Sequence, residues 1–383
     1  MRAKTLVLLL GLSLVACKKP EAGTPGPTPE KPAAKQQVVG LVTDIGGRGD
    51  QSFNDSALRG LETWAANATF KGGKYEPLAA EVRAASIPKD LTGKIEPLSV
   101  KPMVVQSKAQ EDYQPNLLLL IDQGADLTIG VGFMLENAVE AVARTNPNAK
   151  FLLIDSPILD ARGVPQKLPN VRTVVFREEE GSFLVGALAG LVAKEKVGFV
   201  GGMEIPLIKK FESGFRAGVK TTNPKAQVVV AYTGSFDNVA AGKQVGQDFV
   251  AKGAEVVFQA AGSDGLGVIQ AVKEAREAGK TVWAIGVDSD QHHLAPNAML
   301  TSMMKRVDLA VYEAARDVSK GTFTASDIAM GVKEGAVTFA EVRNDFPGKA
   351  EALAKVEELR SKIIAGTLKV PSNLTELESF TAP

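Results

Sequence analysis

Short apolar runs rich in β-branched residues alternate with amphipathic segments from Val38 onward. Nine of these runs predict β-strands. Most are continuous apolar stretches, the pattern of strands that are covered on both faces, as in a parallel sheet. The predicted strands are Val38–Thr43, Leu127–Val131, Phe151–Ile154, Val171–Phe176, Val197–Val200, Gln227–Tyr232, Glu255–Gln259, Thr281–Val287 and Ala298–Met303.

Between these runs, several segments place apolar residues at helical spacing. The apolar stripes are Ala57, Leu61, Trp64 and Ala65; Phe183, Ala187, Leu188 and Leu191; Ile208, Phe211, Phe215 and Val219; and Val268, Ile269, Val272 and Ala275. Strand–helix–strand repetition predicts a doubly wound α/β fold. Because so many strands exceed one ordinary open sheet, we expect two lobes, each a mostly parallel sheet flanked by helices.

The first residues follow a different pattern. Arg2 and Lys4 precede an apolar run from Thr5 to Val15, which is too short to span a bilayer, and the run ends at Leu14-Val15-Ala16-Cys17. This end resembles the bacterial lipobox, so residues 1–16 are predicted to be a lipoprotein signal peptide and Cys17 the lipidated residue. An ordinary signal peptide with a chance cysteine is the alternative.

Residues 17–37 are rich in Pro, Ala, Glu, Lys and Gly and lack an apolar period, so they predict a flexible linker after the lipid. Lys18 and Lys19 stand where an inner-membrane retention signal would have Asp, which leaves open which membrane holds the chain. The linker would keep a folded domain close to a membrane partner.

The composition excludes several classes of function. Lys and Arg number 44, and Asp and Glu also number 44, so no basic excess favours nucleic acid. A single cysteine excludes a disulfide within the chain, and His292 and His293 are the only histidines, so we expect no metal site. A P-loop and a G-x-S-x-G elbow are absent from the sequence, and Gly265-Leu266-Gly267 lacks the third glycine of a dinucleotide fingerprint. These absences weigh against an enzyme and against a bound cofactor, and we expect the chain to act as a monomer.

Polar residues follow four of the predicted strands. They are Asp44, Asp155, the loop Gly262-Ser263-Asp264-Gly265, and Asp288. In open α/β sheets the ligand lies beyond the carboxyl ends of the strands, so these residues predict a polar rim around a site. For each one alone, a helix cap or a turn is the favoured interpretation, but the four together favour a polar rim.

The segment from Thr43 to Asn54 reads TDIGGRGDQSFN. It resembles the opening motif of the basic membrane protein family, the PnrA-like substrate-binding lipoproteins that serve ABC transporters for nucleosides. The resemblance runs from about Val38 to Phe339. Its further motifs are Glu111–Leu117, Gly130–Phe133, Phe183–Gly186, Gly198–Gly202, Phe211–Phe215, Gly286–Gln291 and Thr301–Lys305.

The resemblance implies a two-lobed fold of the periplasmic-binding-protein type I kind, with the ligand in the cleft between the lobes and closure by a hinge motion. The expected first lobe comprises residues 38–176 and about 289–318. The expected second lobe comprises residues 177–288 and about 319–375. The chain would cross between the lobes more than once.

The same resemblance assigns roles to individual residues. Phe53 and Phe211 would stack on the two faces of a purine, and Asp44 and Asn54 would face the cleft from the first lobe. The ribose would be held by a second group of residues: Asp288 accepting its hydroxyls, Lys305 donating to the sugar, and Gly262 and Gly265 allowing close approach of the backbone. From the helical stripe alone, Phe211 could equally be a core residue.

The chain departs from the family pattern at two places. An acidic residue that reads the base is expected a few positions after Gly-x-Gly-Phe, and Asn137, next to Glu136, stands there. An amide both donates and accepts hydrogen bonds, whereas a carboxylate only accepts, so the preferred base can differ from that of the family. The stretch from Lys71 to Met103 is longer than the family norm, and we interpret it as a surface insertion.

The resemblance predicts a lipid-anchored receptor in a bacterial cell envelope, facing the periplasm or the exterior, that delivers purine nucleosides to an ABC permease and its ATPase. Alternatives are a receptor that senses a nucleoside or sugar without transport, and a nucleoside-processing α/β enzyme. Sugar receptors commonly stack pyranoses on Trp, and here both Trp64 and Trp283 fall at predicted core positions, which favours a nucleoside.

Overall fold

The structure, a computed structural model, describes residues 36–382, which belong to one compact unit. The predicted signal peptide, the predicted lipidation at Cys17 and the predicted linker as far as residue 35 lie outside the described residues. Among the described residues, no helix is long and apolar enough to cross a membrane.

The first of two large sheets has six strands, all parallel. Their order is β15-β9-β6-β5-β1-β4. We call this sheet and the helices on it the first lobe. Its strands are β1 (Gln37–Val42), β4 (Val100–Val105), β5 (Leu127–Val131), β6 (Phe151–Ile154), β9 (Val171–Phe176) and β15 (Asp327–Met330).

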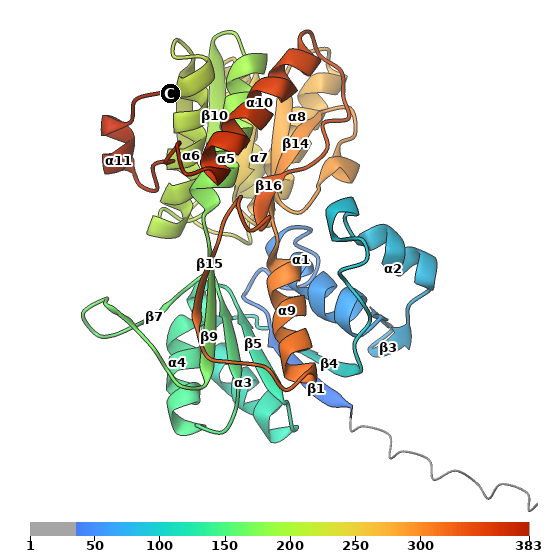
Figure 1. Ribbon diagram of the computed structural model, residues 1–383. Coiled ribbons are helices and arrows are strands. Elements are labelled where there is room, and N and C mark those ends of the chain that lie inside the picture. Colours follow the sequence, from blue (N-terminus) through green and yellow to red (C-terminus); the bar gives the residue numbers. More distant parts are fainter. Residues whose placement is uncertain (1–35, 383) are drawn as a thin grey trace, which may run out of the picture. The chain divides into compact units, whose positions relative to one another are not determined.

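The second sheet also has six strands, in the order β11-β10-β12-β13-β14-β16, and only β16 runs antiparallel to its neighbour. This sheet and its helices form the second lobe (Figure 1). Its strands are β10 (Lys196–Gly201), β11 (Gln227–Tyr232), β12 (Val256–Ala260), β13 (Trp283–Asp288), β14 (Met299–Lys305) and β16 (Val337–Phe339).

All nine predicted strands are present, within two residues of their predicted bounds. The predicted points of crossing between the lobes need correction. Strand β14 pairs in parallel with β13 and so belongs to the second sheet, whereas β15 pairs with β9 in the first. The chain therefore crosses after β9, after β14 and after β15, at about residues 177, 306 and 331, and not at 289 and 319.

Helices cover both faces of each sheet. Apolar side chains of α3 (Tyr113–Asp122) and α4 (Glu136–Thr145) pack on one face of the first sheet, and those of α7 (Val239–Ala251) and α8 (Asp264–Glu277) on one face of the second. The opposite faces share one continuous apolar cluster. Its helical members come from α1 (Phe53–Leu58) and its π-helical continuation (Arg59–Ala65), α5 (Glu178–Val192), α6 (Pro206–Thr222), α9 (Val307–Ser319), α10 (Lys349–Ile364) and α11 (Leu374–Ser379).

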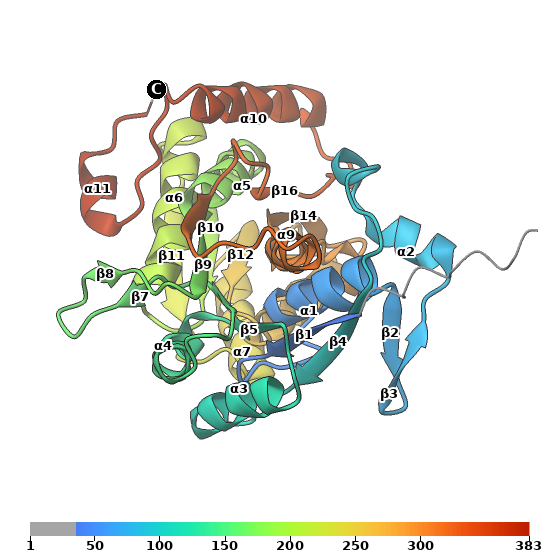
Figure 2. The ribbon, with the colours of Figure 1, turned by 60° about the horizontal axis from the view of Figure 1, so that its bottom comes forward.

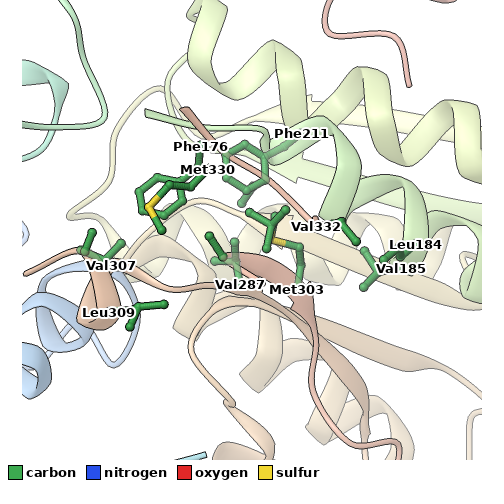
Figure 3. Packing of buried hydrophobic residues seen from close by; sticks show 14 of the residues in the cluster. Phe176, Leu184, Val185, Phe211, Val287, Met303, Val307, Leu309, Met330 and Val332 are labelled. Atoms are coloured by element: carbon green, nitrogen blue, oxygen red, sulfur yellow. The ribbon is translucent and has the colours of Figure 1, made fainter. Parts of the chain in front are cut away.

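The segments that cross between the lobes are themselves apolar. Phe176, Val307, Met330 and Val332 lie at the three crossings, and all are buried in the cluster that both lobes share (Figure 3). Phe211 of α6 packs among them. Burial of this kind stabilises by roughly 1.5–3 kcal/mol per large side chain, so the crossings are held by packing as well as by chain connectivity.

The stretch from Lys71 to Met103 is only in part a surface insertion. It contains the end of a hairpin, β2 (Ala68–Lys71) and β3 (Lys74–Pro77), the short helix α2 (Ala80–Ser86), which has no buried residue, and a 3-10 turn (Lys89–Leu91). These lie at one side of the first lobe, beyond β4 (Figure 2). Val100–Met103, however, belong to β4, which pairs with β1 and completes the first sheet.

Candidate functional site

The carboxyl ends of strands from both lobes meet around a cavity whose empty space, counted together with adjoining open solvent, is about 580 Å³. Residues that follow β1, β5 and β6 line it from the first lobe, and residues of α6 and those that follow or end β11, β12, β13 and β14 line it from the second. The lining residues are Asp44, Gly46, Asp50, Phe53, Asn54, Gly132, Phe133, Asp155, Leu207, Ile208, Phe211, Phe236, Ala260, Gly262, Ser263, Val287, Asp288 and Lys305.

The loop between β1 and α1 carries a hydrogen-bonded polar network. Asn54 Nδ2 donates to Asp44 Oδ1 (2.7 Å) and to Asp50 Oδ2 (3.1 Å). Asp50 also accepts the backbone N–H groups of Ser52, Asn54 and Asp55, which caps the start of α1. Burial raises the pKa of Asp44 to about 6, and the hydrogen bond from Asn54 offsets part of that rise.

Two aspartates at the cavity have a left-handed backbone. Asp155 (φ 72°) follows β6, and Asp288 (φ 62°) ends β13. Non-glycine residues adopt this conformation at a cost of about 1–3 kcal/mol, and such residues cluster at ligand sites. Ser52 Oγ donates to Asp288 Oδ2 across the lobes (2.6 Å). Burial is the main reason that the pKa of Asp288 rises to about 7.

Lys305, at the end of β14, is a buried cation that joins the two lobes. Its Nζ lies 2.5 Å from Asp155 Oδ2 in the first lobe and 3.0 Å from Glu178 Oε1 at the start of α5. Burial alone would lower the pKa of Lys305, but the charges of Asp155, Glu178 and Asp288 outweigh it and raise that pKa, so the ammonium stays protonated.

Aromatic rings from both lobes line the cavity. The Lys305 Nζ lies 5.2 Å from the ring centroid of Phe53 and 5.6 Å from that of Phe211. Phe133, which follows β5, and Phe236, which follows β11, meet edge to face with their centroids 6.4 Å apart. A flat ligand that enters this cavity therefore meets aromatic surface from each lobe.

The cavity adjoins a wider and more open groove. The two spaces share Phe133, Asp155 and Leu207, and the groove continues over Thr173 and Lys210. The groove is open to solvent, and Phe133 lies where it adjoins the cavity.

Seven of the predicted site residues line this one cavity: Asp44, Phe53, Asn54, Phe211, Gly262, Asp288 and Lys305. Phe211 belongs both to the apolar cluster and to the cavity wall, so the two interpretations of that residue are compatible. Gly262 has a positive φ of 55° and brings backbone to the cavity.

Two predicted residues are not part of the cavity wall. Asn137 is exposed in the first turn of α4, because the helix turns its side chain outward, while the neighbouring Glu136 accepts a hydrogen bond from Leu159 N (2.9 Å). Gly265 is buried in the first turn of α8, and a Cβ there would collide with the side chain of Gln259. Gly265 therefore has a packing role within the second lobe.

Several lining residues were not among the predicted site residues. Asp155, Asp50 and Phe133 lie in segments that the sequence had marked, directly after a strand or within a family motif, but without an assigned role. Phe236 lies in the loop after β11, so the rule that ligands bind beyond strand ends would have found it. Leu207 and Ile208 carry no local signal beyond a helix stripe.

The acidic residues near α1 are committed to backbone contacts. Asp55 accepts the N–H groups of Gly49 and Gln51, as Asp50 does those of the helix start. Within residues 36–382, no group of three His, Cys, Asp or Glu side chains is arranged to hold a metal ion. The chemistry that the cavity offers is hydrogen bonding and stacking.

Residues 37–374 match the family described as ABC transporter substrate-binding protein, PnrA-like. The chain is similar to a CD4+ T-cell-stimulating antigen of Listeria innocua, with 34% identity over 96% of this chain and 97% of that protein. It is also similar to the ABC transporter nucleoside-binding protein BmpA of Lactococcus lactis, with 32% identity over 87% of this chain and 88% of that protein. Among solved structures, ABC transporter solute-binding proteins from Aeropyrum pernix match with a TM-score of 0.72 and 27% identity, over 90% of this chain and 96% of that one. The chain belongs to the PnrA-like family of ABC transporter substrate-binding proteins.

Proposed function

We propose that this member of the family is the lipid-anchored receptor of an ABC importer for purine nucleosides. The observation that carries the proposal is the cavity between the lobes, where the rings of Phe53 and Phe211 and the carboxylate of Asp288 lie together. The name of the Lactococcus lactis relative, a nucleoside-binding protein, supports the same ligand class.

The proposed binding mode uses both lobes. Phe53 and Phe211 provide aromatic surface for the base, and stacking contributes about 1–3 kcal/mol per base. Asp288 accepts the two ribose hydroxyls, and hydrogen bonds to a charged group contribute roughly 1.5–3 kcal/mol each. Lys305 has a third N–H beyond those directed at Asp155 and Glu178, which a ribose hydroxyl can accept. Together these contacts reach about 8 kcal/mol, a micromolar affinity.

Both tryptophans are away from the cavity, which favours a nucleoside over a sugar. Trp64 packs against Tyr312 in the core, and Trp283 is buried in β13. Neither is among the residues that line the cavity, so the described cavity wall has no tryptophan on which a pyranose could stack.

The ligand class is tested by a panel of adenosine, guanosine, inosine, cytidine, free bases and sugars, measured by thermal shift and calorimetry on residues 36–382, which belong to one compact unit. We expect the purine nucleosides to raise the melting temperature at millimolar concentration. If none of them does so, the proposed ligand class is wrong. If a sugar alone does so, the ligand is a sugar.

The binding mode is tested by Asp288→Ala. We expect it to weaken purine nucleoside binding by more than about 100-fold, because both ribose hydroxyls lose their charged acceptor, with the circular dichroism spectrum unchanged. The matched control is Asp290→Ala, two residues further on, where the side chain is partly exposed and pairs with Arg343. An unchanged affinity in Asp288→Ala would remove Asp288 from the binding mode.

Lipid anchoring rests on Cys17, which lies outside the described residues, and it is checked separately. In Cys17→Ser, the protein should move from the membrane fraction to the soluble fraction, because an acyl chain contributes about 0.8 kcal/mol per buried methylene to membrane binding. If the variant stays with the membrane, Cys17 is not the anchor.

A further inference from the structure

The wall of the cavity carries more negative than positive charge. Its ionisable members are the carboxylates of Asp44, Asp50, Asp155 and Asp288 and the ammonium of Lys305. All five side chains are buried. Four carboxylates against one ammonium leave three negative charges in excess when all are ionised.

The single cation is not free to bind an anion. The Lys305 ammonium lies 2.5 Å from Asp155 and 3.0 Å from Glu178, and the second carboxylate adds a further negative charge behind the cavity wall. Lys210 is the next cation, and it pairs with Glu178 at 3.1 Å and donates to Phe176 O. Among the residues that the structure describes, no cation without a carboxylate partner lines the cavity.

The carboxylates also repel one another. Burial is the main cause of the raised pKa of Asp44 and of Asp288, and in both cases the charges of Asp50 and Asp155 add to the rise. A further negative charge beside these buried carboxylates would meet this repulsion with reduced screening, because salt screens buried charges less than exposed ones.

We propose that the cavity selects against anionic ligands, so that the receptor captures a nucleoside and excludes the corresponding nucleotide. This inference rests on the proposed function and names the substrate class of the same site. A phosphate monoester carries about −1.5 to −2 charge at pH 7. The ionisable groups of the cavity wall that could face it are carboxylates and one ammonium that is already paired.

The exclusion also places the receptor in a reaction sequence. A nucleotide outside the cell must lose its phosphate before capture. In that hydrolysis water adds to phosphorus, the bond from phosphorus to the 5′ oxygen breaks, and that oxygen takes a proton. The products are the nucleoside and inorganic phosphate. A phosphomonoester-hydrolysing activity in the same compartment is therefore the class of reaction that supplies this ligand from nucleotides.

The test compares three ligands by calorimetry on the purified protein at pH 7.5: adenosine, adenosine 5′-monophosphate and 5′-O-sulfamoyladenosine. The sulfamoyl group is uncharged and close to phosphate in size, so it separates charge from bulk. We expect the Kd of the monophosphate to be at least about 100-fold higher than that of adenosine. The Kd of the sulfamoyl compound should lie within about tenfold of the Kd of adenosine.

Each outcome either supports or overturns the exclusion of nucleotides by charge. A monophosphate that binds within tenfold of adenosine overturns the inference while leaving the proposed function intact. A sulfamoyl compound as weak as the monophosphate shows that size, and not charge, excludes the nucleotide, which also overturns it. If adenosine, guanosine and inosine all fail to bind, the proposed function fails, and this inference fails with it.

Replacing one carboxylate tests whether its charge contributes to the exclusion of the nucleotide. Asp44→Asn removes one negative charge and keeps the shape, so the ratio of the monophosphate Kd to the adenosine Kd should fall by about tenfold. Asp290→Asn, at a partly exposed site away from the cavity wall, should leave the ratio unchanged. The ratio is used because it is insensitive to a uniform loss of affinity. An unchanged ratio in Asp44→Asn contradicts charge exclusion by that residue, and the three-ligand comparison on the unmodified protein decides the rest.

Discussion

The two lobes arrange five strands in the same spatial order, β4-β1-β5-β6-β9 in the first and β11-β10-β12-β13-β14 in the second. Strands β6 and β13 hold the same place in this order, and each is followed or ended by an aspartate with a positive φ, Asp155 or Asp288. The lobes nevertheless differ in how their polar groups at the cavity are satisfied.

In the first lobe, the network of Asp44, Asp50 and Asn54 is closed within one loop and one helix start. In the second lobe, Asp288 finds its hydrogen-bond donor in Ser52, and Lys305 finds a carboxylate in Asp155, both of them from the first lobe. The loop between β1 and α1 therefore satisfies its polar groups within the first lobe. Asp288 and Lys305 each take a partner from the first lobe, although Lys305 also pairs with Glu178 of its own lobe. Such a division suits a receptor in which ligand meets one lobe first and closure completes the site.

The largest effect should come from the ion pair that crosses the lobes. Lys305→Met leaves Asp155 buried without a cation and takes from Glu178 one of its two cations, the other being Lys210. This should lower the free energy of unfolding by about 3–5 kcal/mol. Chemical denaturation of the ligand-free protein measures this. Arg343→Met, which breaks the partly exposed pair with Asp290, is the control and should cost less than about 1 kcal/mol. Equal effects from the two variants would contradict the dependence of the second lobe on the crossing pair.

The second effect is a change of about 2–4 kcal/mol in the free energy of unfolding as the pH changes. The pKa of Asp288 is raised from 3.8 to about 7, so this group favours the folded state at low pH and loses that contribution as pH rises through 7. Asp288→Asn should therefore unfold less readily than the unmodified protein at pH 8, and the two should be alike near pH 4. Melting temperatures across that pH range check this.

The same pH series compares a buried carboxyl group of the first lobe, Asp44, with one of the second, Asp288. The pKa of Asp44 rises only to about 6, because Asn54 and Gly46 donate hydrogen bonds to its carboxylate. Asp44→Asn should therefore stabilise less than Asp288→Asn at pH 8. The comparison fails if the first-lobe variant gives the larger gain.

The smallest effect should come from the aromatic contact between the lobes. Phe133 and Phe236 meet edge to face, and such pairs contribute about 0.5–1.5 kcal/mol beyond burial. In a double-mutant cycle of Phe133→Leu and Phe236→Leu on nucleoside affinity, we expect a coupling energy of about 1 kcal/mol, and faster dissociation in each single variant. Additive effects of the two substitutions would mean that the rings do not act together in closure.

The first-lobe hairpin offers a matched negative control for the aromatic residues. Phe70 of β2 is 41% exposed and stacks against Tyr75, away from the cavity. Phe70→Leu should leave nucleoside affinity and dissociation unchanged, and so separates the loss of an aromatic ring from the loss of a cavity contact.

The strands that the sequence predicted and those that it missed differ in burial. Central strands such as β5 and β6 are buried at every residue, so a continuous apolar run reveals them. Strand β4 carries the exposed Lys101 and also Pro102, and β15 alternates exposed and partly buried residues, because both lie at edges of the first sheet. An edge strand does not require an apolar run, so local pattern can miss it. The edge strand β11 was predicted because its sequence, QVVVAY, is nonetheless apolar.

By itself the sequence determined the α/β class, nine of the strands and the family. It also placed candidate site residues directly after predicted strands. These are properties of neighbouring residues, because apolar periodicity and motif spacing are local. Only the tertiary structure decided that β14 joins the second sheet, that Asn137 faces solvent, that Gly265 makes room for Gln259, and that Lys305 is paired across the lobes. Those outcomes depend on which distant segments pack together, since Asp155 and Lys305 lie 150 residues apart in the chain and meet only through the topology of two sheets.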